Sequence, residues 1–136
     1  MTDTLAGTRS VVVERELPHP PERIWRALTQ PHLMEEWLMK NDFRPEEGRR
    51  FDLAADWGTV HGQVREVEPN RTLSYDWNTK DLRSVVTWTL EPSEKGTILR
   101  MEQTGFRPGQ EAYHRGATAG WPRFLSALEA VLARMD

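Results

Sequence analysis

The apolar residues of this chain change their spacing near residue 50 and again near residue 120. From Arg50 to Glu102 they alternate with polar residues in short segments that are separated by turn sequences, a pattern that predicts a meander of antiparallel strands. The last stretch has apolar residues at helical spacing instead, which predicts one long C-terminal helix. These helical positions are Trp121, Phe124, Leu125, Leu128, Leu132 and Met135. An antiparallel sheet with one apolar face and one long helix to cover it leaves few architectures open.

The segments before residue 50 predict one further strand and two short helices. Residues 10–17 are β-branched at their start and then alternate, as in a strand. Pro21 suits the first turn of a helix over residues 21–29, and a second short helix follows over residues 32–38. Residues 41–48 read as a polar connection. We expect residues 1–9 to be flexible and residues 10–136 to form a single domain.

The C-terminal helix contains one proline, and its start is open to two interpretations. Helical character can begin at Gln110, in which case Pro122 removes the hydrogen bond to the Thr118 carbonyl and kinks the helix. Alternatively, the helix begins near Trp121. We favour the single long, kinked helix. The fold class is then α+β: a curved antiparallel sheet of about six strands around a long C-terminal helix, with two short helices after the first strand.

A single helix cannot fill the hollow of a curved sheet from end to end, so this architecture predicts an apolar cavity. Apolar pockets with a few polar groups are the usual form of small-molecule sites. The candidate ligand-binding residues are taken from the inward positions of the strands, from the second short helix and from the apolar face of the C-terminal helix. They are Trp37, Leu53, Val64, Tyr75, Trp77, Val86, Trp88, Met101, Trp121, Phe124, Leu125 and Leu128. The plainer interpretation is that these side chains simply fill the core.

Several segments of the chain resemble a known family. Residues 11–37 resemble the opening of the Activator of heat shock protein 90 ATPase homologue family. This segment contains a strand, then the sequence Pro20-Pro21-Glu22-Arg23-Ile24-Trp25, and then Trp37. Residues 67–73, 85–90 and 96–99 and the Gly120-Trp121 pair are similar to later parts of that family. The likeness covers nearly the whole chain in the right order.

This family belongs to the START-like (SRPBCC) superfamily, which also holds Bet v-like and calicheamicin-resistance-like proteins. The resemblance implies a helix-grip fold and a hydrophobic ligand, such as a lipid or a polyketide. Calicheamicin-resistance proteins accept a reactive natural product, and the eukaryotic namesakes bind a chaperone and stimulate its ATPase. A chaperone partner, with a role in stress response, is therefore suggested by the resemblance alone.

Composition excludes several other classes of protein. The chain has no cysteine, a formal net charge of −3 and no basic run longer than Arg49-Arg50, so we expect no nucleic-acid partner. No stretch approaches the roughly 18 apolar residues of a membrane span, and the first residues do not form a signal peptide. These features predict a cytoplasmic protein, either a monomer or a weak homodimer.

No set of residues with recognisable catalytic or metal-binding spacing occurs. His19 and His32 lie beside prolines, His61 alternates away from an apolar strand face, and only His114 can approach the cavity. We therefore expect no metal, no cofactor and no catalytic residue, and we favour a binding protein over an enzyme. Two alternatives remain open: an aromatase- or cyclase-like enzyme in which His114 or Tyr113 moves protons, and a co-chaperone-like interaction module.

Overall fold

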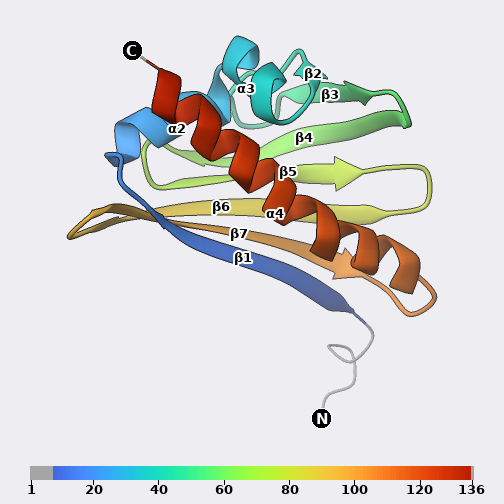
Figure 1. Cartoon of the computed structure of the whole chain (residues 1–136). Coiled ribbons are helices and arrows are strands. Elements are labelled where there is room, and N and C mark those ends of the chain that lie inside the picture. The colour runs from blue at the N-terminus through green and yellow to red at the C-terminus, as the bar shows by residue number, and fades with distance from the viewer. Residues whose placement is uncertain (1–7, 136) are drawn as a thin grey trace.

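The computed structural model describes residues 8–135, which form one sheet and three helices (Figure 1). The N-terminal strand is followed by two short helices and then by six further strands and the long helix. In chain order the elements are β1 (Arg9–Leu17), α2 (Pro21–Thr29), α3 (Pro31–Trp37), β2 (Lys40–Asn41), β3 (Arg50–Ala55), β4 (Gly58–Glu68), β5 (Thr72–Asn78), β6 (Arg83–Ser93), β7 (Gly96–Phe106) and α4 (Glu111–Arg134). The α+β class and the order of elements are as predicted.

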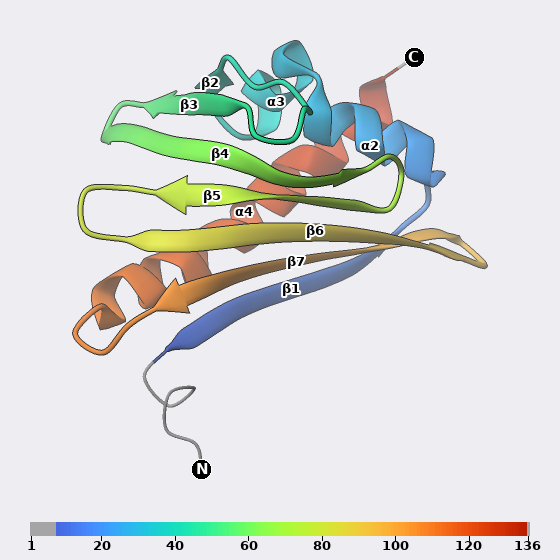
Figure 2. The same ribbon diagram turned by 180° about the vertical axis from the view of Figure 1, so that it is seen from behind.

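The seven strands form a single antiparallel sheet in the order β1-β7-β6-β5-β4-β3-β2. Consecutive strands from β2 to β7 are neighbours, whereas β1 pairs with the last strand, β7. The long helix α4 crosses one face of the sheet, and α2 and α3 lie on the same side at one end (Figure 1). The opposite face carries no helix (Figure 2). This is the helix-grip arrangement.

The inner face of the sheet and the C-terminal half of α4 form the core. Leu125, Leu128 and Leu132 of the helix are at most 1% exposed, as are inward strand residues such as Trp88 and Leu99. Burial of each such side chain contributes on the order of 1.5–3 kcal/mol. The N-terminal half of α4 differs, because none of the residues from Glu111 to Gly120 is buried.

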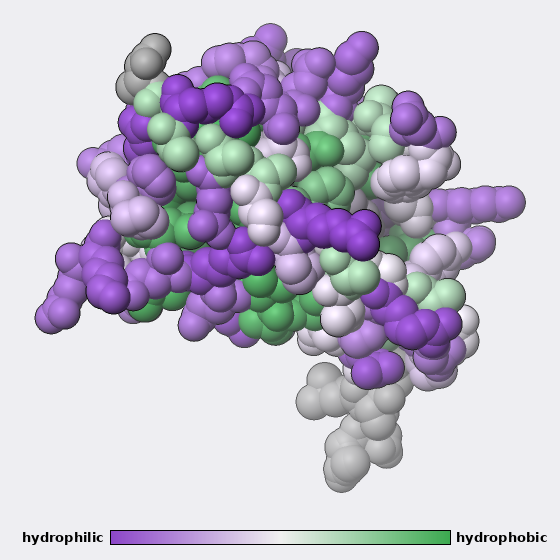
Figure 3. All heavy atoms as spheres, viewed as in Figure 1, coloured by the Kyte–Doolittle hydropathy of each residue, from purple (hydrophilic) through white to green (hydrophobic). Residues whose placement is uncertain are grey.

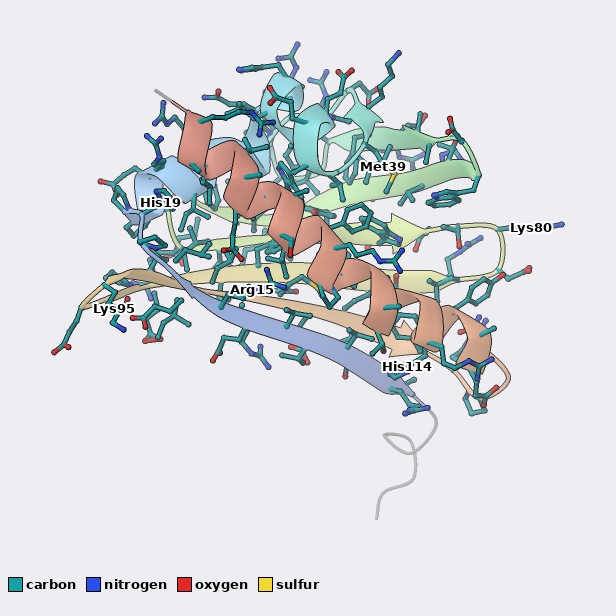
Figure 4. All side chains as sticks on the ribbon, in the orientation of Figure 1. Arg15, His19, Met39, Lys80, Lys95 and His114 are labelled. Atoms are coloured by element: carbon teal, nitrogen blue, oxygen red, sulfur yellow. The ribbon has the colours of Figure 1, made fainter. Side chains whose placement is uncertain are left out.

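Arg15 joins the edge strand β1 to the middle of α4 (Figure 4). Its Nη1 lies 2.6 Å from Oε2 of Glu129, and its Nη2 donates to the Pro122 carbonyl at 3.2 Å. Helix α4 is continuous across Pro122, as the single-helix interpretation predicted. No helix within the described residues is both long enough and apolar enough to cross a membrane.

Three details differ from the sequence predictions. The expected polar connection after α3 contains the short strand β2 and Phe43, which is fully buried. Asn41 explains this burial: its amide donates to the Met39 carbonyl at 2.9 Å and its Oδ1 accepts from the Phe43 N–H at 3.1 Å, so the turn directs Phe43 inward. Strand β7 continues through Gly105 to Phe106, beyond the alternating segment that ended at Glu102. The N-terminal strand starts at Arg9, and the rest of the segment expected to be flexible, residues 1–7, lies outside the described residues.

Candidate ligand-binding site

A cavity of about 430 Å³ lies between the N-terminal half of α4 and the inner face of the sheet. Its walls come from α4, from strands β5 and β7, from the segment after α3, and from the β3–β4 and β5–β6 connections. The lining residues are Met39, Trp57, Trp77, Thr79, Leu82, Gln103, Phe106, Ala112, Tyr113, Gly116, Ala117, Gly120, Trp121 and Phe124. None of them carries a formal charge at neutral pH, so the cavity is uncharged and mainly apolar.

Small residues on α4 explain why the space remains open at this end. Ala112, Gly116, Ala117 and Gly120 face the cavity. A Cβ atom built on Gly116 or Gly120 meets no atom within 4 Å. From Trp121 onward the helix instead carries large apolar residues that reach the sheet. The change from small to large side chains along one helix therefore sets the position of the cavity.

An aromatic wall closes the inner end of the cavity. The ring centroids of Trp77 and Trp121 are 5.1 Å apart, and those of Trp121 and Phe124 are 5.4 Å apart. Trp88 lies behind this wall with its ring edge-on to Trp121 at 5.7 Å. Such tilted and edge-to-face contacts are the favoured geometries of aromatic pairs. The wall is therefore held in place by packing from behind.

A buried hydrogen-bond network connects the wall to the sheet. Trp121 Nε1 donates to Gln103 Oε1 at 2.7 Å, and Gln103 Nε2 donates to Ser84 Oγ at 3.0 Å. Ser84 Oγ in turn donates to the Trp77 carbonyl at 2.5 Å. Gln103 is only 2% exposed, so its amide would be costly to bury without these partners. The network fixes the one strongly polar side chain of the cavity.

Two aromatic residues stand at the cavity mouth. Trp57, in the β3–β4 turn, is 64% exposed, and Tyr113 of α4 is 40% exposed. The Tyr113 hydroxyl donates to Asp81 Oδ2 at 3.4 Å, which ties α4 to the β5–β6 loop. Figure 3 shows hydrophobic residues at the surface between α4 and the β3–β4 side of the molecule. Large apolar side chains left exposed at an opening are typical of a binding site.

The predicted ligand-binding residues fall into two groups. Trp77, Trp121 and Phe124 line the cavity. The other nine are buried in the core outside it: Trp37, Leu53, Val64, Tyr75, Val86, Trp88, Met101, Leu125 and Leu128. The prediction took its helix lining from the stripe that starts at Trp121, whereas most of the α4 residues that line the cavity precede Trp121. Contact of these nine with a ligand stays a prediction.

The sequence prediction missed most of the cavity's polar and small residues. Gln103 continues the inward alternation of Leu99 and Met101, so its position as a buried polar residue could have been read from β7. The repeated small residues of α4 carried a second signal, because Gly116 and Gly120 lie one helical turn apart on the face that should be most apolar. Trp57 was not among the predicted ligand-binding residues, although it lines the cavity.

The candidate catalytic histidine lies outside the cavity. His114 Nε2 is 3.1 Å from the Ser10 carbonyl oxygen, and its ring packs edge-on against Phe106 at 5.3 Å. Figure 4 shows it beside the start of β1. Tyr113, named with it as a candidate proton carrier, does line the cavity and is the only lining residue with an ionisable side chain.

A second, larger hollow lies on the helix-free face of the sheet and is polar. It measures about 560 Å³, and its walls include Asp42, Arg50 and Asp76. His61 and Asp52 also line it and face each other at 2.8 Å, with more than half of each side chain exposed. Among residues 8–135, no three His, Asp or Glu side chains come close enough together to hold a metal ion. Apart from Phe51 and Gly62, all residues that line this hollow are polar or charged, in contrast to the mainly apolar inner cavity.

Tyr75 shows how dry the core next to the cavity is. Its side chain is 1% exposed, and burial raises the pKa of its hydroxyl well above the usual value of 10.0. The Trp88 indole N–H donates to this hydroxyl at 2.9 Å, which opposes the rise in pKa only in part. Tyr75 therefore serves the core as a neutral hydrogen-bond partner for Trp88.

A curved antiparallel sheet that grips one long helix over an apolar cavity defines a helix-grip protein of the START-like class. Residues 18–133 match the family described as Activator of Hsp90 ATPase homolog 1-like protein. The chain belongs to this family, as the sequence resemblance implied. Among curated proteins, none matches the chain at a significant level.

Solved structures show the same fold. Protein MLL2253 from Mesorhizobium loti is 59% identical, with a TM-score of 0.91 over 94% of this chain and 99% of that protein. Protein BH1534 from Bacillus halodurans is 27% identical, with a TM-score of 0.82 over 91% and 96% of the two chains. DynU16, a protein of the dynemicin biosynthetic locus, is 24% identical, with a TM-score of 0.82 over 92% of this chain and 47% of its own. This chain therefore spans about half the length of DynU16.

Proposed function

We propose that this protein is a cytoplasmic binding protein for a small hydrophobic, aromatic molecule, held in the cavity under the N-terminal half of α4. The observation that carries the proposal is the open, uncharged space of about 430 Å³ beside a fixed aromatic wall. The fold that this chain shares with DynU16, a protein of a biosynthetic locus, is in keeping with a small-molecule ligand.

The wall favours flat ligands over flexible chains. Trp77 and Trp121 are already fixed by contacts with each other and with residues behind them, so little side-chain entropy is lost on binding. A ligand ring that packs against Trp77 or Trp121 gains about 0.5–1.5 kcal/mol of binding free energy for each aromatic contact, in addition to the gain from the apolar area it buries. Trp57 and Tyr113 at the mouth can cover the outer end of such a ring.

The proposal is for binding rather than catalysis. Acid–base catalysis needs groups that can exchange protons near the reacting atoms. Tyr113 is the one ionisable residue in the lining, and its hydroxyl already donates to Asp81 at the mouth. Hydrogen-bonding and apolar groups make up the rest of the lining, and these suffice to hold and orient a ligand.

Plugging the cavity from α4 tests the proposal. Nile red is a neutral, flat dye whose emission rises and shifts to the blue in an apolar site. We expect the wild-type protein to bind it and the Gly116→Phe variant to lose binding, because position 116 opens into the cavity. Ala119→Phe is the matched control, since Ala119 is exposed on the same helix and does not line the cavity.

Circular dichroism and thermal unfolding establish that each variant is folded. Failure of the wild-type protein to bind Nile red, or equal binding by Gly116→Phe and the wild type, would refute the proposed site. Loss of binding in Ala119→Phe as well would mean that the dye reports on the helix surface rather than on the cavity.

A further inference from the structure

The direction of each hydrogen bond at Gln103 is fixed by its partners. An indole N–H can only donate, so the amide atom that faces Trp121 must be the oxygen, Oε1. The amide nitrogen Nε2 therefore faces Ser84, whose Oγ accepts one of its two N–H groups. Ser84 keeps this accepting role because its own hydroxyl hydrogen is donated to the Trp77 carbonyl. The orientation of the amide thus follows from the chemistry of its neighbours.

This arrangement leaves hydrogen-bond donors on side chains that line the cavity. The second N–H of Gln103 Nε2 has no partner among the described residues. The indole N–H groups of Trp77 and Trp57, which both line the cavity, also have no partner within residues 8–135. All three groups donate and none of them accepts. A ligand can satisfy them only with acceptor atoms.

The cavity also selects against charge. None of its lining residues carries a formal charge at neutral pH. A charged group buried there would lose its hydration without gaining a counter-ion, which costs several kcal/mol in a protein interior. Neutral oxygen acceptors, such as the carbonyl of an aromatic ketone or quinone, avoid this cost.

We infer that the ligand is a neutral, flat aromatic molecule with a carbonyl-type acceptor oxygen, and that Gln103 is the residue that selects for this oxygen. The inference rests on the proposed function, because it assigns a role in ligand recognition to a polar residue of the same cavity. Gln103 Nε2 donates to the ligand oxygen, while Trp77 and Trp121 contact its rings. The anchored amide gives the ligand one preferred orientation.

Three tricyclic probes of nearly the same shape separate the acceptor from the rings. 9-Fluorenone carries a carbonyl acceptor, fluorene carries no polar group, and carbazole carries only an N–H donor. The quantity to measure is the ratio of the fluorenone affinity to the fluorene affinity, in the wild type and in Gln103→Met. One hydrogen bond corresponds to about a 2- to 10-fold change in this ratio. Within one protein, the ratio cancels effects of the substitution that are common to both probes. Comparing the ratio between the wild type and the variant cancels the difference in hydrophobicity between the probes.

We expect the ratio to fall by that factor in Gln103→Met and to stay unchanged in the control Gln63→Met, which alters an exposed residue of the other sheet face. Carbazole should bind more weakly than fluorenone to the wild type. An equal ratio in the wild type and Gln103→Met would overturn the assignment of Gln103 while leaving an aromatic binding site. Failure of all three probes to bind would instead refute the proposed function.

The carbonyl stretch of bound fluorenone gives a second measurement, which needs no variant. Gln103→Met removes the partners of Trp121 and Ser84 and can therefore impair folding. In infrared difference spectra of the wild-type complex, the band should lie below its position in a hydrocarbon solvent, toward its position in an alcohol. A band at the hydrocarbon position would show that no donor meets the carbonyl and would overturn the inference.

Discussion

The two glycines of α4 that line the cavity should lower the stability of the protein. Glycine inside a helix costs about 0.5–1 kcal/mol relative to alanine, because the unfolded chain has more backbone freedom to lose. A Cβ at Gly116 or Gly120 meets nothing within 4 Å, so no clash offsets the gain from alanine. The double variant Gly116→Ala/Gly120→Ala should therefore be about 1–2 kcal/mol more stable. For a chain of this length that corresponds to a rise in Tm of about 3–7 °C.

Calorimetry and urea unfolding measure the change, and a third glycine supplies the control. Gly109 also has open space around its Cβ position, but its φ is +90°, so Gly109→Ala should destabilise the protein. The same double variant should bind Nile red more weakly, because two methyl groups enter the cavity. An unchanged or lower Tm in a natively folded double variant would refute this account of why the helix carries glycine there.

Three further predictions follow from individual residues. Leu128→Ala should lower the free energy of unfolding by about 2–5 kcal/mol in urea titrations, because Leu128 is fully buried and does not line the cavity; a loss below 1 kcal/mol would contradict its packing. Above pH 10, Tyr75 ionises in the unfolded chain but stays neutral in the folded protein. The free energy of unfolding should therefore fall with rising pH, by up to about 1.4 kcal/mol per pH unit, and Tyr75→Phe should remove this contribution. His114→Ala should leave the Nile red affinity unchanged within about three-fold, since no binding step uses this side chain.

The fold could be predicted from the sequence because its signals are local and repeated. The period-2 segments after residue 50 became strands β3 to β7, and the stripe from Trp121 to Leu132 became the packed half of α4. Helix α2 has the bounds that Pro21 and Thr29 indicated. Phe43 was missed because its burial depends on the Asn41 turn, and a single aromatic residue in a polar stretch has no periodicity to detect.

The existence of the cavity could be predicted from the sequence, but its position could not. The position of the cavity depends on where side chains of the helix and of the sheet are too short to contact each other. Alternation of apolar residues in the sequence indicates which residues point inward, but it does not give the distance between the helix and the sheet. Leu125 and Leu128 share a helix stripe with Trp121, yet only Trp121 borders open space. The small residues at 112, 116, 117 and 120 held the missing information, because short side chains on an inward helix face leave volume unfilled.

The pairing of the first strand with the last sets the order in which the protein can fold. Strands β3 to β7 join neighbours in sequence and can form as successive hairpins, whereas β1 pairs only with β7, for example Val11 with Gln103. Contacts between residues so far apart in sequence slow folding, because a long loop must close before they form. During synthesis on the ribosome, β1 therefore emerges first and stays without its strand partner until β7 has been made. Gln103 lies on that last strand, so the side chain that we assign to ligand selection reaches its place only as the sheet is completed.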